Sequence, residues 1–255
     1  MKKLHLIYIP FTGLGIKEYG GDEWYQYRAN LFRDYTLKSL TAQTDRNFTI
    51  WISFRPQEKE NPITKQIEND IKKTGLDYIF TFDGIMMHDD RGVWHNTDLE
   101  QRMEKSLNEL KEHLGYADWV FKTDLGSDDM FHREAIREIK AEEPRPRGAT
   151  YYLNGYILNM TTGQLAQWNR NTSCSKYTII YPYETFFNAK KHLEHIKGLI
   201  SHEYTPLVFD ATRLPDGRYM CGVHEGNIST TWENKFRGDE FFGDEKNNIL
   251  RQFGL

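Results

Sequence analysis

Cysteine is nearly absent from this chain, which has only Cys174 and Cys221 among its 255 residues. The two form no CxxC pair, so the sequence predicts neither a thiolate zinc site nor a disulfide framework. Long apolar runs are missing as well, and none is long enough to cross a bilayer. The short run in MKKLHLIYIPF is stopped by Pro10, unlike a signal peptide. We therefore expect a cytoplasmic protein with no transmembrane segment.

A basic surplus is also missing, because 33 basic side chains stand against 37 acidic ones and the net charge is −4. A general nucleic-acid binder needs a basic surplus or stripe, so we expect no nucleic-acid partner. The glycine-rich segment PFTGLGIKEYGGDEW has Glu18 where a dinucleotide fingerprint needs its third glycine. No Gly-Lys-Ser or Gly-Lys-Thr follows it, so a P-loop is excluded too.

Apolar runs and amphipathic segments alternate through the first half of the chain. Strands are expected at 4–10, 47–54, 76–82 and 117–124, and helices at 27–44, 61–75, 96–115 and 130–143. This alternation predicts an α/β fold with a mostly parallel, Rossmann-like sheet flanked by helices. The pattern is less regular after EEPRPRG (142–148). There we expect a hairpin over 149–160 around Asn154-Gly155, a strand at 177–183 and a helix at 184–198.

The stretch WVFKTDLGSDDMF (119–131) places three carboxylates, Asp124, Asp128 and Asp129, beyond the fourth expected strand. Ligands of open parallel sheets bind beyond the carboxyl ends of the strands. Carboxylate oxygens suit a hard divalent cation, so Mg²⁺ or Mn²⁺ is the predicted ligand. The alternative is that Ser127, Asp128 and Asp129 cap a helix starting near Met130, where negative charge is favourable. That alternative leaves Asp124 unexplained.

This Asp-rich turn resembles the metal-binding DxD region of GT-A glycosyltransferases. YTLKSLTAQTDRNFTIWISF (35–54) is similar to the segment that joins helix one to strand two in family 2-like members. DEWYQYRANLFRDYTLKSL (22–40) and GVHEGNIST (222–230) resemble the rhamnosyltransferase group of that superfamily. One position departs from the pattern, because Gly126 stands where the first Asp of the motif falls if Asp128 and Asp129 are matched.

The resemblance implies a single GT-A-like domain over 1–255. Its first half (1–147) would bind a nucleotide sugar, and a mixed α+β half (148–255) would hold the acceptor. The implied activity is transfer of a hexosyl or deoxyhexosyl group from a UDP-, dTDP- or GDP-sugar to a hydroxyl acceptor, with a glycan expected. Transfer would be assisted by Mn²⁺ or Mg²⁺ and would invert the anomeric centre.

The resemblance also assigns roles to single residues. It implies metal ligation by Asp128, Asp129 and His224. The alternative role for His224 is that of a hydrogen-bonded core histidine. Donor contacts are expected from Asp83, Asp124, Arg28 and Arg55, although Asp83 in FDG also reads as a turn residue and most arginines are simply on the surface. The base that an inverting enzyme needs is assigned to Glu184, with Glu225 as the second candidate. Helix capping is the alternative role for Glu184.

Two other functions remain open on the sequence. A sugar nucleotidyltransferase shares a metal-bound diphosphate on an α/β sheet, but it wants a glycine-rich and basic loop after the first strand, where FTGLGIKEYGG offers only Lys17. The other is a non-catalytic GT-A-like domain that binds a glycan or nucleotide. The Gly126 departure keeps this second alternative open.

Overall fold

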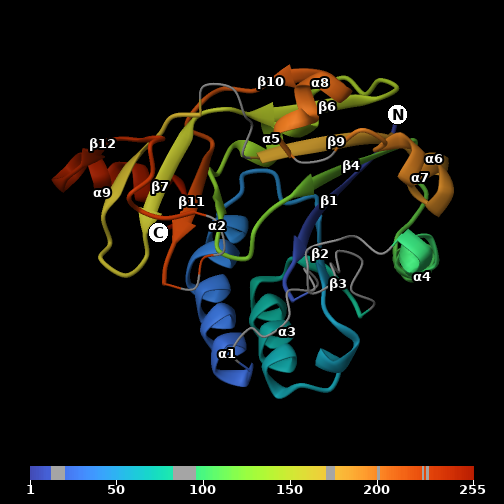
Figure 1. Cartoon of the computed structure of the whole chain (residues 1–255), viewed down its shortest axis with the longest axis horizontal. Coiled ribbons are helices and arrows are strands. Elements are labelled where there is room, and N and C mark those ends of the chain that lie inside the picture. The colour runs from blue at the N-terminus through green and yellow to red at the C-terminus, as the bar shows by residue number, and fades with distance from the viewer. Residues whose placement is uncertain (13–20, 83–95, 171–175, 200–201, 226, 228–229) are drawn as a thin grey trace.

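The larger of two sheets forms the centre of the molecule (Figure 1). The computed structural model describes residues 1–12, 21–82, 96–170, 176–199, 202–225, 227 and 230–255. Within these ranges the strand order is β10-β6-β9-β4-β1-β2-β3. The strands are β1 (Lys3–Pro10), β2 (Thr49–Ser53), β3 (Asp77–Thr81), β4 (Trp119–Asp124), β6 (Gly148–Tyr152), β9 (Lys176–Pro182) and β10 (Asp210–Arg213). β1 to β4 are parallel, so their carboxyl ends lie at one edge, while β9 runs antiparallel to β4 and β6.

The second sheet has the order β12-β8-β7-β11-β5 and lies beside the first, with the C-terminal helix next to it (Figure 1). Its strands are β5 (Met130–Phe131), β7 (Gly155–Asn159), β8 (Leu165–Trp168), β11 (Tyr219–Val223) and β12 (Arg237–Phe241). The expected hairpin over 149–160 is wrong, because β6 joins the first sheet and β7 the second. At the start of β7, a side chain at Gly155 would overlap the Tyr219 carbonyl. Glycine therefore allows the close approach of β7 to β11 that moves the chain between sheets.

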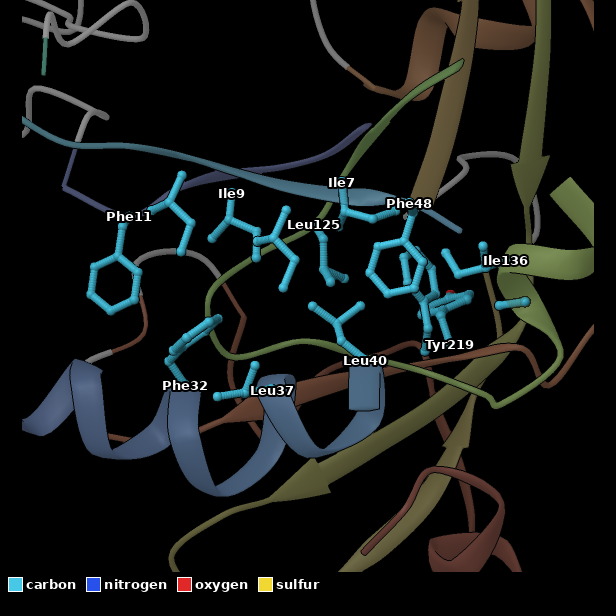
Figure 2. Close-up of a cluster of buried hydrophobic side chains, with 14 of the residues drawn as sticks. Ile7, Ile9, Phe11, Phe32, Leu37, Leu40, Phe48, Leu125, Ile136 and Tyr219 are labelled. Carbon is cyan, nitrogen blue, oxygen red and sulfur yellow. The ribbon is translucent and has the colours of Figure 1, made fainter. Parts of the chain in front are cut away.

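Helices cover both faces of the first sheet, as the alternation predicts. On one face lie α1 (Gly21–Leu31), the π-helical η1 (Phe32–Thr36), α2 (Leu37–Thr41) and α3 (Pro62–Thr74), which bury Phe32 and Leu40 against Ile7 and Ile9 (Figure 2). On the other lie α4 (Asn96–His113), α6 (Tyr183–Phe186) and α7 (Ala189–His195). The predicted α/β fold class, a mostly parallel sheet flanked by helices with a mixed C-terminal half, is confirmed.

The remaining helices are short or lie outside the first sheet. They are η2 (Pro56–Glu58), α5 (Ala135–Ala141), η3 (His202–Tyr204), α8 (Thr205–Val208) and α9 (Gly243–Gln252). Ile249 and Phe253 of the C-terminal segment pack on the second sheet with Met130 and Met220. No helix in the described part of the chain combines the length and the apolar character needed to span a bilayer.

Local signals set the bounds of α3 as the sequence predicts. The Asn61 side chain accepts a hydrogen bond of 2.8 Å from the amide of Ile63, and Pro62 opens the helix. Gly75 ends it in the left-handed region at φ 67°. The next strand, β3, starts two residues later, so α3 returns the chain directly to the edge of the sheet.

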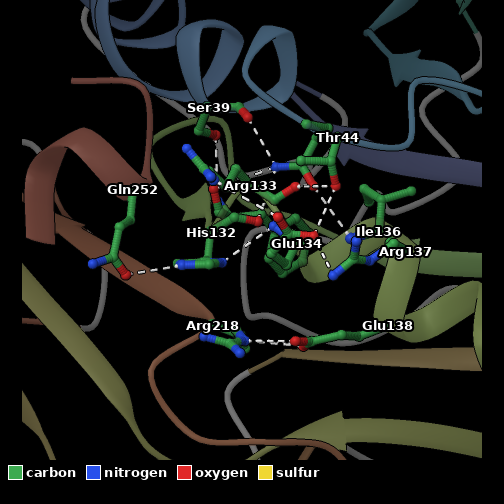
Figure 3. Close-up of polar contacts among 12 residues, drawn as sticks. Ser39, Thr44, His132, Arg133, Glu134, Ile136, Arg137, Glu138, Arg218 and Gln252 are labelled. Carbon is green, nitrogen blue, oxygen red and sulfur yellow. Dashed lines mark hydrogen bonds and ion pairs between the residues drawn. The ribbon is translucent and has the colours of Figure 1, made fainter.

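The segment 35–54 fixes the chain that follows the Asp-rich turn. Ser39 Oγ accepts a hydrogen bond of 3.3 Å from the amide of Phe131, and Gln43 Nε2 donates to the His132 carbonyl at 3.1 Å. Gln43 Oε1 in turn accepts from the amide of Ile136. Figure 3 shows this region, with His132 reaching Gln252 of α9 at 2.9 Å. The Ser39 and Gln43 side chains thereby position β5 and the start of α5 relative to the first sheet.

Candidate functional site

A tight turn follows β4 at the carboxyl edge of the parallel strands. The Leu125 amide donates to the Tyr8 carbonyl at 2.9 Å, and the Asp129 amide donates to the Gly126 carbonyl at 3.2 Å. The chain then enters β5, which pairs antiparallel with β11. A helix capped by Asp128 and Asp129 is therefore wrong, because residues 130–131 are extended and α5 begins only at Ala135. The carboxylates of the turn are free of a capping role.

Gly126 is required by the way the two carboxylates fold over the turn. A Cβ at this position would lie 2.5 Å from Asp129 Oδ2 and 2.9 Å from Asp128 Oδ1. An aspartate in its place would put a third carboxylate among the other two. A side chain at position 126 would thus require both carboxylates to move, which gives a steric reason for the departure from the DxD pattern.

Asp128 contacts two residues that are distant in sequence, Arg28 of α1 and His224 after β11. Arg28 Nη1 donates to Asp128 Oδ2 at 2.8 Å, and Nη2 donates to Ser127 Oγ at 2.5 Å. His224 Nε2 lies 3.1 Å from the same Asp128 oxygen and 2.6 Å from Arg28 Nη1. The His224 side chain is fully buried, and those of Asp128 and Arg28 are 13% and 12% exposed.

This cluster keeps Asp128 ionised despite its burial. Burial favours the uncharged acid, but the hydrogen bond with His224 and the charge of Arg28 outweigh it and lower the pKa of Asp128 well below its usual range. A buried carboxylate with a guanidinium partner is a fixed charge at neutral pH. The cation beside Asp128, which the sequence assigns to a metal ion, is supplied in this structure by Arg28.

The two other carboxylates are also paired with lysines. Lys176 Nζ, at the start of β9, donates to Asp129 Oδ2 at 2.5 Å, and the Gly222 amide donates to Asp129 Oδ1 at 3.3 Å. Burial disfavours the charged amine, yet Asp129 raises the pKa of Lys176 above its usual value. Lys122 Nζ reaches both oxygens of Asp124, at 2.8 and 2.7 Å. Each acidic side chain of the stretch 119–131 therefore has a basic partner within hydrogen-bond distance.

Arg55 does not contact this cluster. Arg55 follows β2, where its guanidinium is paired with Glu58 and its amide donates to Thr12 Oγ1 at 3.0 Å. Its charge is thus neutralised locally, away from Asp128. Asp83 lies outside the described residues. Of the predicted donor contacts, the structure brings Arg28 to the cluster and leaves Asp124 beside it, at the end of β4.

The predicted base Glu184 lies at the wrong end of the sheet. Because β9 is antiparallel to β4, Pro182 pairs with Trp119 and Thr178 pairs with Thr123. Glu184 therefore lies near the amino end of β4, five residues of strand away from the carboxyl edge. We do not retain it as the base. The second candidate, Glu225, is exposed and follows the buried His224 directly.

The arrangement does not fit a divalent ion held jointly by Asp128, Asp129 and His224. Asp129 points to Lys176 and Gly222, whereas Asp128 and His224 both contact Arg28. In the described part of the chain, no three or more His, Cys, Asp or Glu side chains are grouped to hold a metal. The predicted Mn²⁺ or Mg²⁺ stays a prediction.

Sequence reasoning missed Lys176, Lys122 and Tyr27. Lys176 and Lys122 stand in apolar strands, an unusual place for lysine, and this was the available signal that each needs a buried acidic partner. The ring of Tyr27, one residue before Arg28, packs edge-on against His224 with 5.3 Å between centroids. Tyr27 is 39% exposed, so its ring also borders solvent beside the cluster.

Among family models, one matches this chain. Residues 17–75 match the family described as "Putative rhamnosyl transferase". The match covers α1 to α3 with β2, and it includes Arg28, Ser39 and Gln43. No curated protein matches the chain in sequence.

Solved structures are similar to it at low sequence identity. The inositol-1-phosphate CTP transferase from T. maritima is 10% identical with a TM-score of 0.42, covering 99% of this chain and 96% of that one. Residues 1–349 of S. aureus TarS in complex with UDP are 12% identical with a TM-score of 0.44, covering 88% of this chain. This chain spans 61% of that TarS fragment.

The segment of the chain that carries Arg28 is also the segment that the family model matches. The resemblance read from 22–40 and 35–54 is confirmed there, and the architecture around it is the predicted one. Over residues 17–75, this α/β protein is similar to the family described as "Putative rhamnosyl transferase".

Proposed function

We propose that this protein is a glycosyltransferase that moves a hexosyl or deoxyhexosyl group from a UDP-, dTDP- or GDP-sugar to a hydroxyl acceptor, such as a glycan. One observation carries the proposal. Three segments that resemble glycosyltransferases meet at the contacts of Arg28, Asp128 and His224. Segments 22–40 and 222–230 resemble the rhamnosyltransferase group, and 119–131 resembles the GT-A DxD region. The three segments are about 100 and 196 residues apart in sequence, and their convergence on one point supports a common site.

The position of the cluster supports a nucleotide ligand. It lies beyond the carboxyl ends of β1, β2 and β4, where open α/β sheets bind their ligands. Asp124, at the end of β4, is 18% exposed and held by Lys122, so we assign it to the ribose of the donor. We assign Arg28 and Lys176 as N–H donors to the leaving diphosphate, because fixed donors stabilise developing negative charge.

The acceptor side of the proposed site is bordered by Glu225 and Tyr27. In an inverting transfer, the acceptor oxygen bonds to the anomeric carbon as the carbon–phosphate oxygen bond breaks, and the nucleoside diphosphate leaves. The hydroxyl proton passes to a carboxylate, a role we assign to the exposed Glu225. Burial and the charge of Glu225 raise the pKa of Tyr27, which indicates that the two side chains are close. An exposed aromatic ring suits the C–H face of a sugar.

Nucleotide binding is the experiment that tests this proposal. Purified protein is heated with UDP, GDP, dTDP or CDP, each in EDTA and in Mn²⁺. One nucleotide at 100 times its Kd is expected to stabilise the native state by about 2.7 kcal/mol, seen as a higher Tm. Asp128→Asn should lose this shift because the Arg28 guanidinium is no longer held in position by the Asp128 carboxylate. Glu184→Gln, a matched change at the opposite edge, should keep it. No shift with any nucleotide would refute the proposal.

A further inference from the structure

We infer that Arg28 takes the position between Asp128 and His224 that a divalent cation takes in a carboxylate–histidine site, so that donor binding in this chain needs no divalent ion. The inference deepens the proposed function, and its part on nucleotide binding rests on that function. Its part on metal binding concerns only side chains of the cluster and stands on their geometry.

The first argument is the single lone pair of His224 Nε2. This atom lies 2.6 Å from Arg28 Nη1 and 3.1 Å from Asp128 Oδ2. If Nε2 is unprotonated, its lone pair accepts from Arg28. If Nε2 carries the proton, it donates to Asp128 and has no lone pair for a metal. In either tautomer His224 Nε2 is committed and cannot ligate an ion while Arg28 holds this place.

The second argument is that hydrogen bonds and burial hold His224 in place. The His224 amide donates to Asn227 Oδ1 at 2.8 Å, and Asn227 Nδ2 donates to the Gly222 carbonyl at 3.0 Å. The imidazole is fully buried, so it has no solvent side to which it can turn. An ion at Asp128 and His224 would therefore require Arg28 to leave, and its guanidinium would have to find other partners.

The third argument is the donor capacity that Arg28 retains. A guanidinium has five N–H bonds in a planar fork that suits phosphate oxygens. Nη1 serves Asp128 and lies 2.6 Å from His224 Nε2, while Nη2 serves Ser127 Oγ. Among the described residues, this leaves one Nη2 hydrogen and Nε without an acceptor, and Nε is buried. Asp128 orients the fork, and the remaining Nη2 donor is the group we assign to a diphosphate oxygen.

Mn²⁺ binding tests the inference without any nucleotide. Free Mn²⁺ is titrated against the protein and measured by electron paramagnetic resonance and calorimetry. Wild type is expected to show no site at millimolar Mn²⁺. Arg28→Ala uncovers Asp128 and His224 together, and it should gain one Mn²⁺ site that Arg28→Ala/Asp128→Asn lacks. Arg55→Ala is the matched control, because it uncovers only Glu58 and should gain no such site.

Two results would overturn the inference. One is a wild-type Mn²⁺ site that Asp128→Asn removes, since the ion would then bind where Arg28 is placed. The other is a folded Arg28→Ala protein that binds no Mn²⁺. If circular dichroism shows that Arg28→Ala does not fold, Arg28→Gln replaces it in the same comparison.

The nucleotide arm separates this inference from the proposed function. The nucleotide shift of wild type is expected to be equal in EDTA and in Mn²⁺, whereas a shift that appears only with Mn²⁺ would overturn the inference and leave the glycosyltransferase proposal intact. If no nucleotide binds, the proposed function fails. The Mn²⁺ comparison of wild type and Arg28→Ala still decides what occupies the place between Asp128 and His224.

Discussion

Replacing Lys176 with methionine is expected to lower the free energy of unfolding by about 3 kcal/mol. Lys176 and Asp129 are 2.5 Å apart, with side chains only 11% and 13% exposed. Methionine fills similar volume but leaves Asp129 as a buried carboxylate that keeps, among the described residues, the Gly222 amide as its donor. Removing one partner of a buried pair costs far more than the pair contributes, because the other charge loses its compensation. Urea unfolding at pH 7 measures the change.

The double variant separates charge from packing. In Lys176→Met/Asp129→Asn the uncompensated charge is gone, so most of the lost stability should return, to within about 1.5 kcal/mol of wild type. Lys190→Met, at an exposed position of α7, is the matched control and should change stability by less than about 0.5 kcal/mol. If Lys176→Met proved as stable as Lys190→Met, the buried ion pair at Asp129 would be wrong.

A second large effect is expected from Gly222→Ala in β11. A Cβ at Gly222 would overlap the backbone oxygen of Asp128 and the end of the Met160 side chain. Met160 is flexible, but the Asp128 carbonyl belongs to the tight turn and must move with it. Overpacking of this kind costs about 1 to 3 kcal/mol. Because the shift moves Asp128 away from Arg28 and His224, the nucleotide-induced rise in Tm should be lost as well.

Gly115→Ala provides the comparison for this variant. A Cβ at Gly115 would meet only Lys2 Nζ, at 3.5 Å, which is ordinary contact. Its unfolding free energy and nucleotide shift should match those of wild type. A Gly222→Ala protein that behaved like Gly115→Ala in both measurements would show that β11 and the Asp-rich turn are not in close contact.

Local signals made the first half of the fold predictable from sequence. The Asn61 cap and the Gly75 stop act within one turn of the chain, and the structure follows them. The apolar pattern that marks each strand or helix is likewise contained within that element. The expected hairpin at Asn154-Gly155 failed because its outcome depends on a distant strand. β7 pairs parallel with β11, some 60 residues later, and no local pattern contains that information. The same holds for Met130-Phe131, whose partner is also β11.

The residues of the candidate site that lie in a recognisable motif could be predicted from sequence. Those that reach the site only through the pairing of distant strands could not. The segments containing Arg28, Asp128 and His224 each carry a resemblance, and the structure brings these three together. Lys176 has no motif and reaches Asp129 through the antiparallel pairing of β9 with β4. That same pairing sends Glu184 to the opposite edge. A helix start after a strand does not reveal strand direction, so the sequence could not decide between Glu184 and Glu225.

Product analysis with the intact protein tests the central claim of sugar transfer most directly. UDP-, dTDP- and GDP-sugars are each incubated with the protein in EDTA, with a pyranoside acceptor and without one, and the released phosphates are separated. We predict release of a nucleoside diphosphate from one donor, abolished in Asp128→Asn and strongly reduced in Glu225→Gln. The account would be contradicted if no donor released a nucleoside diphosphate. If the protein instead released pyrophosphate from a nucleoside triphosphate and a sugar 1-phosphate, it would be identified as a nucleotidyltransferase.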